Sequence, residues 1–267
     1  MNYNINQFRK EFGSEDKCLE YVFKKRFPAL SGYYRVKGRK CWANAEGKQI
    51  HPLSGTVFEK SSTSLQNWFY AIYLFSVSRN GVSAKELQRQ LGVTYKTAWR
   101  IAYQIRELMK QDGGILSGNV EVDETYIGGT RRMASKMKNK SAVMGMVERK
   151  GKIVAKHIPN RYDSTLINEI NENIEKGSQL FTDEWGAYKK VAKMGYKRRS
   201  VQHGRKQFSR GVAHTNTIEG FWSQFKRSVS GTYHSVSSKH LQSYVNEFSF
   251  RYNHRASPMF EALMGKI

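Results

Sequence analysis

Apolar residues recur at helical spacing through much of the first half of the chain. Residues 64–76 show this pattern most clearly, and their predicted buried stripe consists of Leu65, Trp68, Phe69, Ile72, Tyr73 and Phe75. Residues 16–27 predict a short basic helix. Between these segments, residues 32–50 alternate Tyr, Val and Trp with basic residues and glycines, which predicts short strands and turns.

Residues 83–108 predict two short helices joined by a glycine-containing turn. Ser83 with Glu86 forms a capping-box pattern, and the first helix ends at Gly92. The second begins at Thr94, with Ala98, Ile101, Ala102, Ile105 and Leu108 as its buried stripe. This is the helix-turn-helix pattern, in which the start of the second helix contacts a DNA groove. The candidate DNA contacts are Tyr95, Lys96, Trp99 and Arg100; the alternative is an ordinary helical hairpin.

After a predicted hinge at residues 112–114 the pattern changes to strands. Val120 and Val122 point to one face, and Glu121 and Asp123 point to the other. Further strands are predicted at residues 141–148, 152–158, 179–183 and 198–202, and helices at 163–174, 216–228 and 239–253. Three strands, a helix, a strand and later helices are the order of a ribonuclease-H-like domain. We therefore expect an α+β or α/β fold with a mixed sheet flanked by helices.

Three segments are expected along the chain. Residues 1–63 form a small N-terminal segment, residues 64–112 a helical segment with the helix-turn-helix, and residues 113–267 the ribonuclease-H-like domain.

The charge of the chain indicates a polyanionic partner. It has 45 Lys and Arg against 22 Asp and Glu, a net charge of +23. Neutralising phosphates releases counterions and drives binding to nucleic acid. A membrane surface is not expected, because no apolar run approaches the ~20 residues of a spanning helix. The N-terminus lacks the apolar stretch of a signal peptide. Two cysteines suit a reducing cytosol, so we expect a cytoplasmic, nucleoid-associated protein.

Basic residues concentrate in two further stretches. Arg131 and Arg132 follow the first acidic strand, and residues 189–210 contain nine Lys or Arg. The candidate DNA contacts in the second stretch are Lys197, Arg198, Arg199, Arg205 and Lys206. Such runs are usually solvated surface, but both flank acidic residues that are candidates for catalysis.

Three carboxylates are the candidate catalytic residues, and each has an ordinary alternative. Asp123 could be an exposed strand residue, with Glu121 or Glu124 as the real ligand. Asp183 could cap a strand end. Glu219 could form a capping box with Asn216.

The helix that carries Glu219 adds a lysine to this group. Lys226 lies two turns after Glu219 on the same helix face, where it can touch a phosphate.

The motifs around these residues resemble the DDE transposases of bacterial insertion sequences. Asp183 and Glu219 are 36 residues apart. The segments that carry the resemblance are Val120–Gly129, Thr182–Tyr188, His214–Trp222, Gly231–His234, Val245–Phe248, Phe250–Asn253, Gly55–Phe58 and Thr97–Arg100. Together they are similar to one branch, the insertion-sequence family numbered fifteen ninety-five.

The resemblance implies a transposase that cleaves and joins DNA strands with two Mg²⁺ ions, Mn²⁺ being the alternative. Asp123, Asp183 and Glu219 would hold the metals, and Lys226 would touch the phosphate. Some members use Asn as the third residue, so Asn216 stays an alternative. The implied partners are double-stranded DNA, as terminal inverted repeats and target, and further copies in a homodimer or higher oligomer on DNA. The rival functions are a DNA-binding regulator that lost the chemistry and another ribonuclease-H-like nuclease.

The chain departs from these relatives at its N-terminus. They usually carry a zinc ribbon with two Cys pairs, whereas Cys18, Cys41 and His51 are too few for a closed site. We therefore expect a degenerate ribbon-like segment without structural zinc, held by aromatic residues such as Tyr33, Tyr34 and Trp42.

Overall fold

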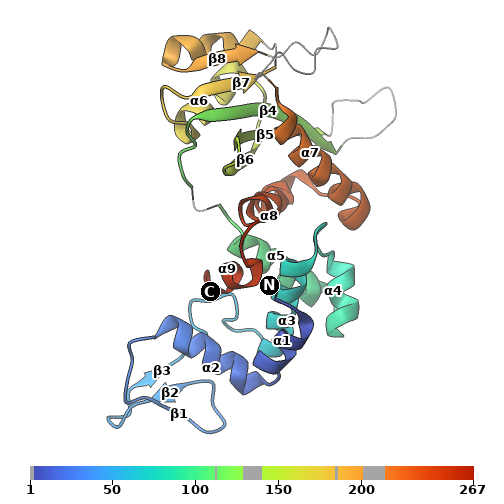
Figure 1. The fold of residues 1–267 in the computed structure, drawn as a ribbon. Helices are drawn as coiled ribbons and strands as arrows, with labels where there is room; N and C mark the ends of the chain where they lie inside the picture. Colours follow the sequence, from blue (N-terminus) through green and yellow to red (C-terminus); the bar gives the residue numbers. More distant parts are fainter. Residues whose placement is uncertain (1–2, 112, 129–139, 184–185, 201–213) are drawn as a thin grey trace. The chain divides into compact units, whose positions relative to one another are not determined.

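The computed structural model describes residues 3–111, 113–128, 140–183, 186–200 and 214–267. The chain divides into two compact units (Figure 1). The N-terminal unit comprises the chain up to Leu108 together with Ala256–Ile267, and the sheet unit comprises Met109–Arg255. The last segment of the chain therefore belongs to the unit in which the chain begins. The three-segment division expected from the sequence stays a prediction.

Helices form most of the N-terminal unit. They are α1 (Ile5–Glu11), α2 (Glu15–Arg26), α3 (Leu65–Val77), α4 (Ala84–Leu91), α5 (Tyr95–Leu108) and α9 (Met259–Met264). The predicted helices at 16–27 and 64–76 are thus confirmed. Helix α3 is central, since Trp68, Phe69 and Ile72 have no exposed surface. Helix α9 packs on α3, where the Phe260 ring lies 6.5 Å from Tyr73, and Phe260 also lies 4.7 Å from Tyr3 and 6.2 Å from Phe8.

Helices α4 and α5 form the predicted helix pair. Gly92 ends α4 in the left-handed conformation at φ 64°. The capping box is only half formed, because the Ser83 hydroxyl accepts the Glu86 N–H while the Glu86 side chain bonds Arg89 and Gln90. The predicted stripe of α5 is buried except Leu108, which is half-buried. A DNA-reading role for this pair stays a prediction.

A small three-stranded antiparallel sheet lies between α2 and α3 in the sequence. Its strands are β1 (Tyr34–Arg35), β2 (Trp42–Ala43) and β3 (Gln49–Ile50). Trp42 stacks on Phe23 of α2 with ring centroids 4.2 Å apart and an interplanar angle of 4°. The Arg35 guanidinium lies 5.0 Å from the Trp42 ring. Tyr34 is 59% exposed, so the expectation that it holds this segment was wrong, and Phe23 is the residue that packs on Trp42.

The sheet unit contains a five-stranded mixed sheet in the order β6-β5-β4-β7-β8. The strands are β4 (Asn119–Gly128), β5 (Lys140–Glu148), β6 (Ile153–Ile158), β7 (Gln179–Thr182) and β8 (Lys197–Ser200). β4, β5 and β6 are antiparallel neighbours, whereas β7 and β8 run parallel to β4. The helices are α6 (Asp163–Asn173), α7 (Asn216–Ser228) and α8 (Leu241–Asn253). This arrangement is consistent with the expected ribonuclease-H-like domain.

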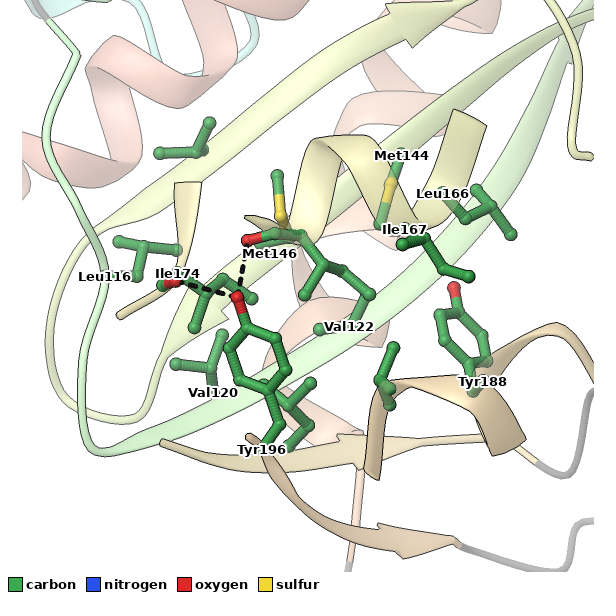
Figure 2. Close-up of a cluster of buried hydrophobic side chains, with 14 of the residues drawn as sticks. Leu116, Val120, Val122, Met144, Met146, Leu166, Ile167, Ile174, Tyr188 and Tyr196 are labelled. Carbon is green, nitrogen blue, oxygen red and sulfur yellow. Dashed lines mark hydrogen bonds between the residues drawn. The ribbon is translucent and has the colours of Figure 1, made fainter. Parts of the chain in front are cut away.

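Each face of this sheet has its own core. Figure 2 shows the face covered by α6, where Val120, Val122, Met144 and Met146 pack with Leu166. There the Tyr196 hydroxyl donates a hydrogen bond of 3.1 Å to the Ile174 carbonyl. On the other face, α7 and α8 contribute Ile218, Phe221, Trp222, Phe225, Val245 and Phe248, which pack with Val143 and Val147. Residues of β5 alternate between these two buried faces, which explains its apolar run from Ala142 to Val147.

Helix α8 also covers the edge of the sheet at β6. The Asn253 side chain accepts the Ile153 N–H at 2.8 Å and donates to the Ile153 carbonyl at 3.0 Å. Gln242 accepts the His157 N–H at 2.7 Å, and Gln111 donates to the Ala155 carbonyl at 2.9 Å. An edge strand presents such backbone groups on alternate residues, so these amides substitute for a sixth strand. Within the described ranges, no helix is long and apolar enough to cross a bilayer.

We predict that the purified protein contains no stoichiometric zinc. Cys18 and Cys41 are buried free thiols, and the small sheet packs through the Phe23–Trp42 stack. Mass-spectrometric metal analysis after gel filtration, and thermal melting with and without a chelator, measure this. Trp42→Ala should lower the melting temperature while the chelator does not. One tightly held zinc per chain would contradict the prediction.

Candidate active site

A buried carboxylate on β4 anchors the start of helix α7. The Glu121 side chain has no exposed surface. Its oxygens accept the backbone N–H groups of Thr217 at 2.8 Å and Ile218 at 3.1 Å, and the Thr217 hydroxyl at 3.0 Å. Helix N-termini have unpaired N–H groups and a positive dipole end, which favour a carboxylate. A residue nearly one hundred positions earlier in the chain therefore caps α7.

Arg149 neutralises this carboxylate and connects it to two other elements. Its Nε lies 2.9 Å from Glu121, and its guanidinium donates to the His214 carbonyl at 2.7 Å. The guanidinium also lies 3.8 Å from the centroid of the Phe181 ring on β7. One side chain thus contacts β4, β7 and the segment before α7.

A glycine lets α7 approach the sheet beside Asp123. Gly145 on β5 is the register partner of Asp123. A Cβ at Gly145 would lie 2.6 Å from the Trp222 ring and 2.7 Å from the Ile218 side chain. Trp222 is only 4% exposed. Its buried indole Nε1 has no hydrogen-bond partner among the described residues.

Asp123, Asp183 and Glu219 influence one another electrostatically. The pKa of Asp123 is raised to about 6, mainly by burial and then by the charges of Asp183 and Glu219 in that order. Like charges disfavour ionisation mainly at short range. Asp123 on β4 therefore lies near enough to Asp183, after β7, and to Glu219, on α7, for their charges to act on it.

Asp183 and Glu219 each make a contact of their own. The Asp183 carbonyl accepts a hydrogen bond of 2.8 Å from Arg198, whose Nε donates to the Thr182 hydroxyl at 3.0 Å. Burial lowers the pKa of Arg198, and the charge of Asp183 raises it. Glu219 is exposed and accepts the Thr215 hydroxyl at 2.8 Å. Arg198, a candidate DNA contact, thus supports the strand end that carries Asp183.

The acidic residues next to Asp123 have other partners. Glu121 anchors α7. Glu124 lies on the opposite face of β4, where Arg161 contacts it at 3.0 Å. The pKa of Glu124 is raised to about 8, mainly by burial, which the charge of Arg161 opposes and the charges of Asp123 and Asp183 reinforce.

The capping box between Asn216 and Glu219, the alternative interpretation of Glu219, does not form. The N-cap of α7 is Thr215, and Asn216 is an exposed first helical residue.

The donor chemistry suits Mg²⁺, which prefers carboxylate oxygens. Among the residues that the structure describes, no three His, Cys, Asp or Glu side chains lie close enough to hold an ion. Metal binding by Asp123, Asp183 and Glu219 is therefore part of the proposal below.

The candidate DNA-contacting residues fall into three groups. Lys226 is exposed on α7, and Lys197 and Arg199 are exposed on β8. Tyr95, Lys96, Trp99 and Arg100 are all exposed on α5 in the other unit. Arg131, Arg132, Arg205 and Lys206 lie outside the described residues.

Sequence reasoning missed Arg149 and Gly145. A glycine inside an apolar strand was the available signal, because it often marks a close approach of another element. Arg149 offered no local signal, since its partners come from distant parts of the chain.

The carboxylates on a ribonuclease-H-like sheet are consistent with an enzyme that acts on nucleic acid. Comparison of the sequence with protein families makes this specific. Residues 115–253 match the family described as "ISXO2-like transposase domain", which covers just over half of the chain. The chain therefore belongs to this family of insertion-sequence transposases.

Known proteins similar to the chain include a relative from an archaeon. The chain is 26% identical over 252 residues to "Uncharacterized protein in transposable element ISH50" of Halobacterium salinarum, covering 87% of this chain and 84% of that protein. Among solved structures, it is similar to a chain of the simian T-cell lymphotropic virus intasome in complex with PP2A regulatory subunit B56 gamma. That likeness has a TM-score of 0.34 at 12% identity, covering 70% of this chain and 72% of that chain, and it carries no argument here.

We predict that Glu121→Gln destabilises the protein by about 3–5 kcal/mol, because it removes the negative charge that balances the mostly buried Arg149 guanidinium. Urea unfolding measures the change. Glu20→Gln is the matched control, since it breaks the exposed pair with Lys24 and should cost less than about 1 kcal/mol. Equal stability of the two variants would show that the anchor is unimportant.

We predict that Asp123→Asn stabilises the metal-free protein at pH 8. The folded-state pKa of about 6 is above the ordinary value of 3.8, so the wild type loses stability as pH rises from about 4 through 6. One pKa unit is about 1.4 kcal/mol, so we expect a gain on the order of 1–3 kcal/mol at pH 8 and little at pH 4. Unfolding experiments at both pH values, with a chelator present, measure it. A pH-independent effect would contradict the electrostatic coupling.

Proposed function

We propose that this protein is a DNA transposase that binds the terminal inverted repeats of its insertion sequence and catalyses metal-dependent strand cleavage and strand transfer. The observation that carries the proposal is the electrostatic coupling of Asp123 with Asp183 and Glu219. Their mutual repulsion costs stability, and a divalent cation would relieve it. Membership of the transposase family supports the same chemistry.

The roles of the residues follow from their positions. Asp123, Asp183 and Glu219 would hold two Mg²⁺ or Mn²⁺ ions. When bound, such ions supply activation of the attacking hydroxyl and stabilisation of the leaving oxygen. Lys226, exposed two turns after Glu219 on α7, would contact a phosphate of the DNA. Glu121, Arg149 and Gly145 keep α7 at the distance from β4 that this arrangement needs.

DNA binding rests on charge and on exposed side chains. The net charge of +23 favours a polyanion. Tyr95, Lys96, Trp99 and Arg100 would enter a groove of the terminal repeat. Lys197 and Arg199 on β8 would contact phosphates near the carboxylates, as would Arg131, Arg132, Arg205 and Lys206. We further propose that the protein works in the cytoplasm at the nucleoid and assembles on DNA as a homodimer or higher oligomer.

Two rival functions remain distinct from this one. A regulator derived from a transposase would bind the same DNA ends without cutting them. Another ribonuclease-H-like nuclease would cut without preference for those ends. The three functions are separated by incubating a DNA fragment that bears the ends of the element with and without Mg²⁺ and measuring binding and cleavage. A transposase binds and cuts the ends, a regulator binds them uncut, and another nuclease cuts without preference for them.

We predict that Asp183→Asn abolishes strand cleavage but leaves DNA binding near wild type. The change removes a metal ligand and leaves the basic surfaces intact. Losing a residue that only hydrogen-bonds a metal ligand lowers activity roughly 10–100-fold. Losing the ligand Asp183 itself should lower the cleavage rate by more than this. Cleavage and gel-shift assays on the same terminal-repeat fragment measure both effects. Normal cutting by Asp183→Asn would refute the proposed site.

We predict that Lys96→Ala with Arg100→Ala weakens end-specific binding by roughly 1–3 kcal/mol for each base that the variant no longer touches. The pair Arg9→Ala with Lys25→Ala removes the same charge from exposed positions of the same unit and serves as control. Competition binding between terminal-repeat and unrelated duplexes measures specificity. If both double variants prefer the terminal repeat over unrelated duplex equally strongly, α4 and α5 form a structural hairpin. Recognition of the terminal repeat would then lie in another part of the chain.

A further inference from the structure

The sheet unit contains a cavity beside the candidate active site that no residue role assigned above explains. It has a volume of about 500 Å³ and lies between the end of β4, the start of β5 and the segment that leads into α6. Its main polar and aromatic lining residues are Tyr126, Lys140, His157, Asn160, Arg161 and Tyr162. This volume is in the usual range for a site that holds a small molecule or a single nucleotide.

The lining combines cations with aromatic rings. The Arg161 guanidinium lies 5.3 Å and the Lys140 ammonium 6.0 Å from the centroid of the Tyr126 ring. None of the described residues that line the cavity is acidic. By contrast, the cavity of about 650 Å³ beside the small N-terminal sheet is lined by both Asp16 and Glu20. The exposed Lys140 therefore favours an anion in this cavity, and Arg161, which pairs with Glu124 behind the wall, adds further guanidinium donors.

Tyr162 supplies an accessible ring at the mouth of this cavity. It is 71% exposed, although large apolar side chains are usually buried. Its position is fixed through the backbone, because the Asn160 side chain accepts the Tyr162 N–H at 3.0 Å and the Thr165 hydroxyl at 2.7 Å. Tyr162 is the N-cap residue of α6, but its side chain makes no capping hydrogen bond. The ring is therefore not required for capping this helix.

His157 and Ser238 add neutral polar groups. The His157 Nε2 and the Ser238 hydroxyl oxygen lie 3.4 Å apart on the cavity wall. Burial lowers the pKa of His157, so the neutral imidazole offers both a donor and an acceptor. Neutral donors and acceptors of this kind can pair with the polar edge of a base.

The cavity is connected to the acidic residues through one ion pair. Arg161 contacts Glu124 at 3.0 Å, and Glu124 directly follows Asp123 on β4. The charges of Asp123 and Asp183 both act on Glu124. Tyr126 of the cavity wall also follows Asp123 by three residues on β4, roughly 10 Å along the strand, so a DNA strand bound at Asp123 can extend to the cavity around the end of the sheet.

We propose that this cavity binds one unpaired nucleotide of the DNA strand that lies at the acidic residues. Its base stacks on Tyr162, and its phosphate contacts Lys140 and Arg161. A paired base cannot enter, because its partner strand occupies the edge and face that the cavity must contact. The inference rests on the proposed function, since it takes DNA as the substrate.

Photochemical crosslinking tests the proposal directly. The probe is a short single-stranded oligothymidylate with one 5-iodouracil, which forms adducts with a stacked aromatic residue on irradiation. We expect the adduct on Tyr162, located by mass spectrometry of the digested protein. An adduct only on residues outside the cavity would overturn the proposal.

A matched pair of double variants tests the contribution of the cavity to binding. Tyr162→Ala with Lys140→Ala should weaken binding of the single strand by at least about fivefold. Tyr34→Ala with Lys152→Ala removes the same side-chain types from exposed positions outside the cavity and should have little effect. Duplex affinity should be the same for both. Equal single-strand affinity of the two double variants would refute the proposal, and equal melting temperatures exclude misfolding.

Competition separates a strand from a free nucleotide. Thymidine monophosphate and inorganic phosphate should each displace the oligothymidylate only weakly, and displacement as strong as that by unlabelled strand would overturn the assignment to DNA. None of these measurements uses cleavage. Absent cleavage with an intact crosslink would therefore reject the transposase chemistry alone, whereas normal cleavage without the crosslink would reject the cavity alone.

Discussion

The arrangement of the candidate site depends on one buried charge, the carboxylate of Glu121. A carboxylate without exposed surface is costly unless ion pairs and hydrogen bonds satisfy it. Arg149 and the first N–H groups of α7 provide these contacts, which fixes how close α7 lies to β4. At that distance the large Trp222 side chain fits only over a glycine, Gly145. The position of Glu219 relative to Asp123 follows from the same anchor.

Two glutamates of the central strand β4 point to opposite faces of the sheet, and each pairs with its own arginine. Glu121 pairs with Arg149 on the face covered by α7, and Glu124 pairs with Arg161 on the face covered by α6. Asp123 lies between these two glutamates and faces the charges of Asp183 and Glu219. Burial and neighbouring carboxylates raise the pKa of both Asp123 and Glu124, so the fold holds the ionised forms of these two residues at an energetic cost. Stored electrostatic strain of this kind is typical of functional sites.

Local patterns in the sequence predicted most elements of the fold. The stripe of α3, the strands at 141–148 and 152–158, and the span of α7 at 216–228 are confirmed, because each depends on neighbouring residues. Long-range contacts could not be predicted in this way. Glu121 caps α7 in place of the alternative capping box of Asn216 and Glu219, and Phe23 of α2 is the residue on which Trp42 of the small sheet packs. The choice of Asp123, Asp183 and Glu219 as the acidic trio came from family motifs, and this trio, its metal binding and the DNA contacts stay predictions.

Because residues Ala256–Ile267 belong to the N-terminal unit, mutations that truncate the gene near its end affect that unit first. Phe260 of α9 completes an aromatic cluster with Tyr3, Phe8 and Phe12. A frameshift or stop codon after Arg255 would leave every candidate catalytic and DNA-reading residue in the translated product, yet it would expose this cluster to water. Loss of the last short segment would therefore harm the helical unit first. Truncation at the C-terminus removes α9, which packs on α3, and so destabilises the helical unit together with the catalytic function. A descendant that kept only DNA binding would therefore have to lose catalysis by substitution of the carboxylates.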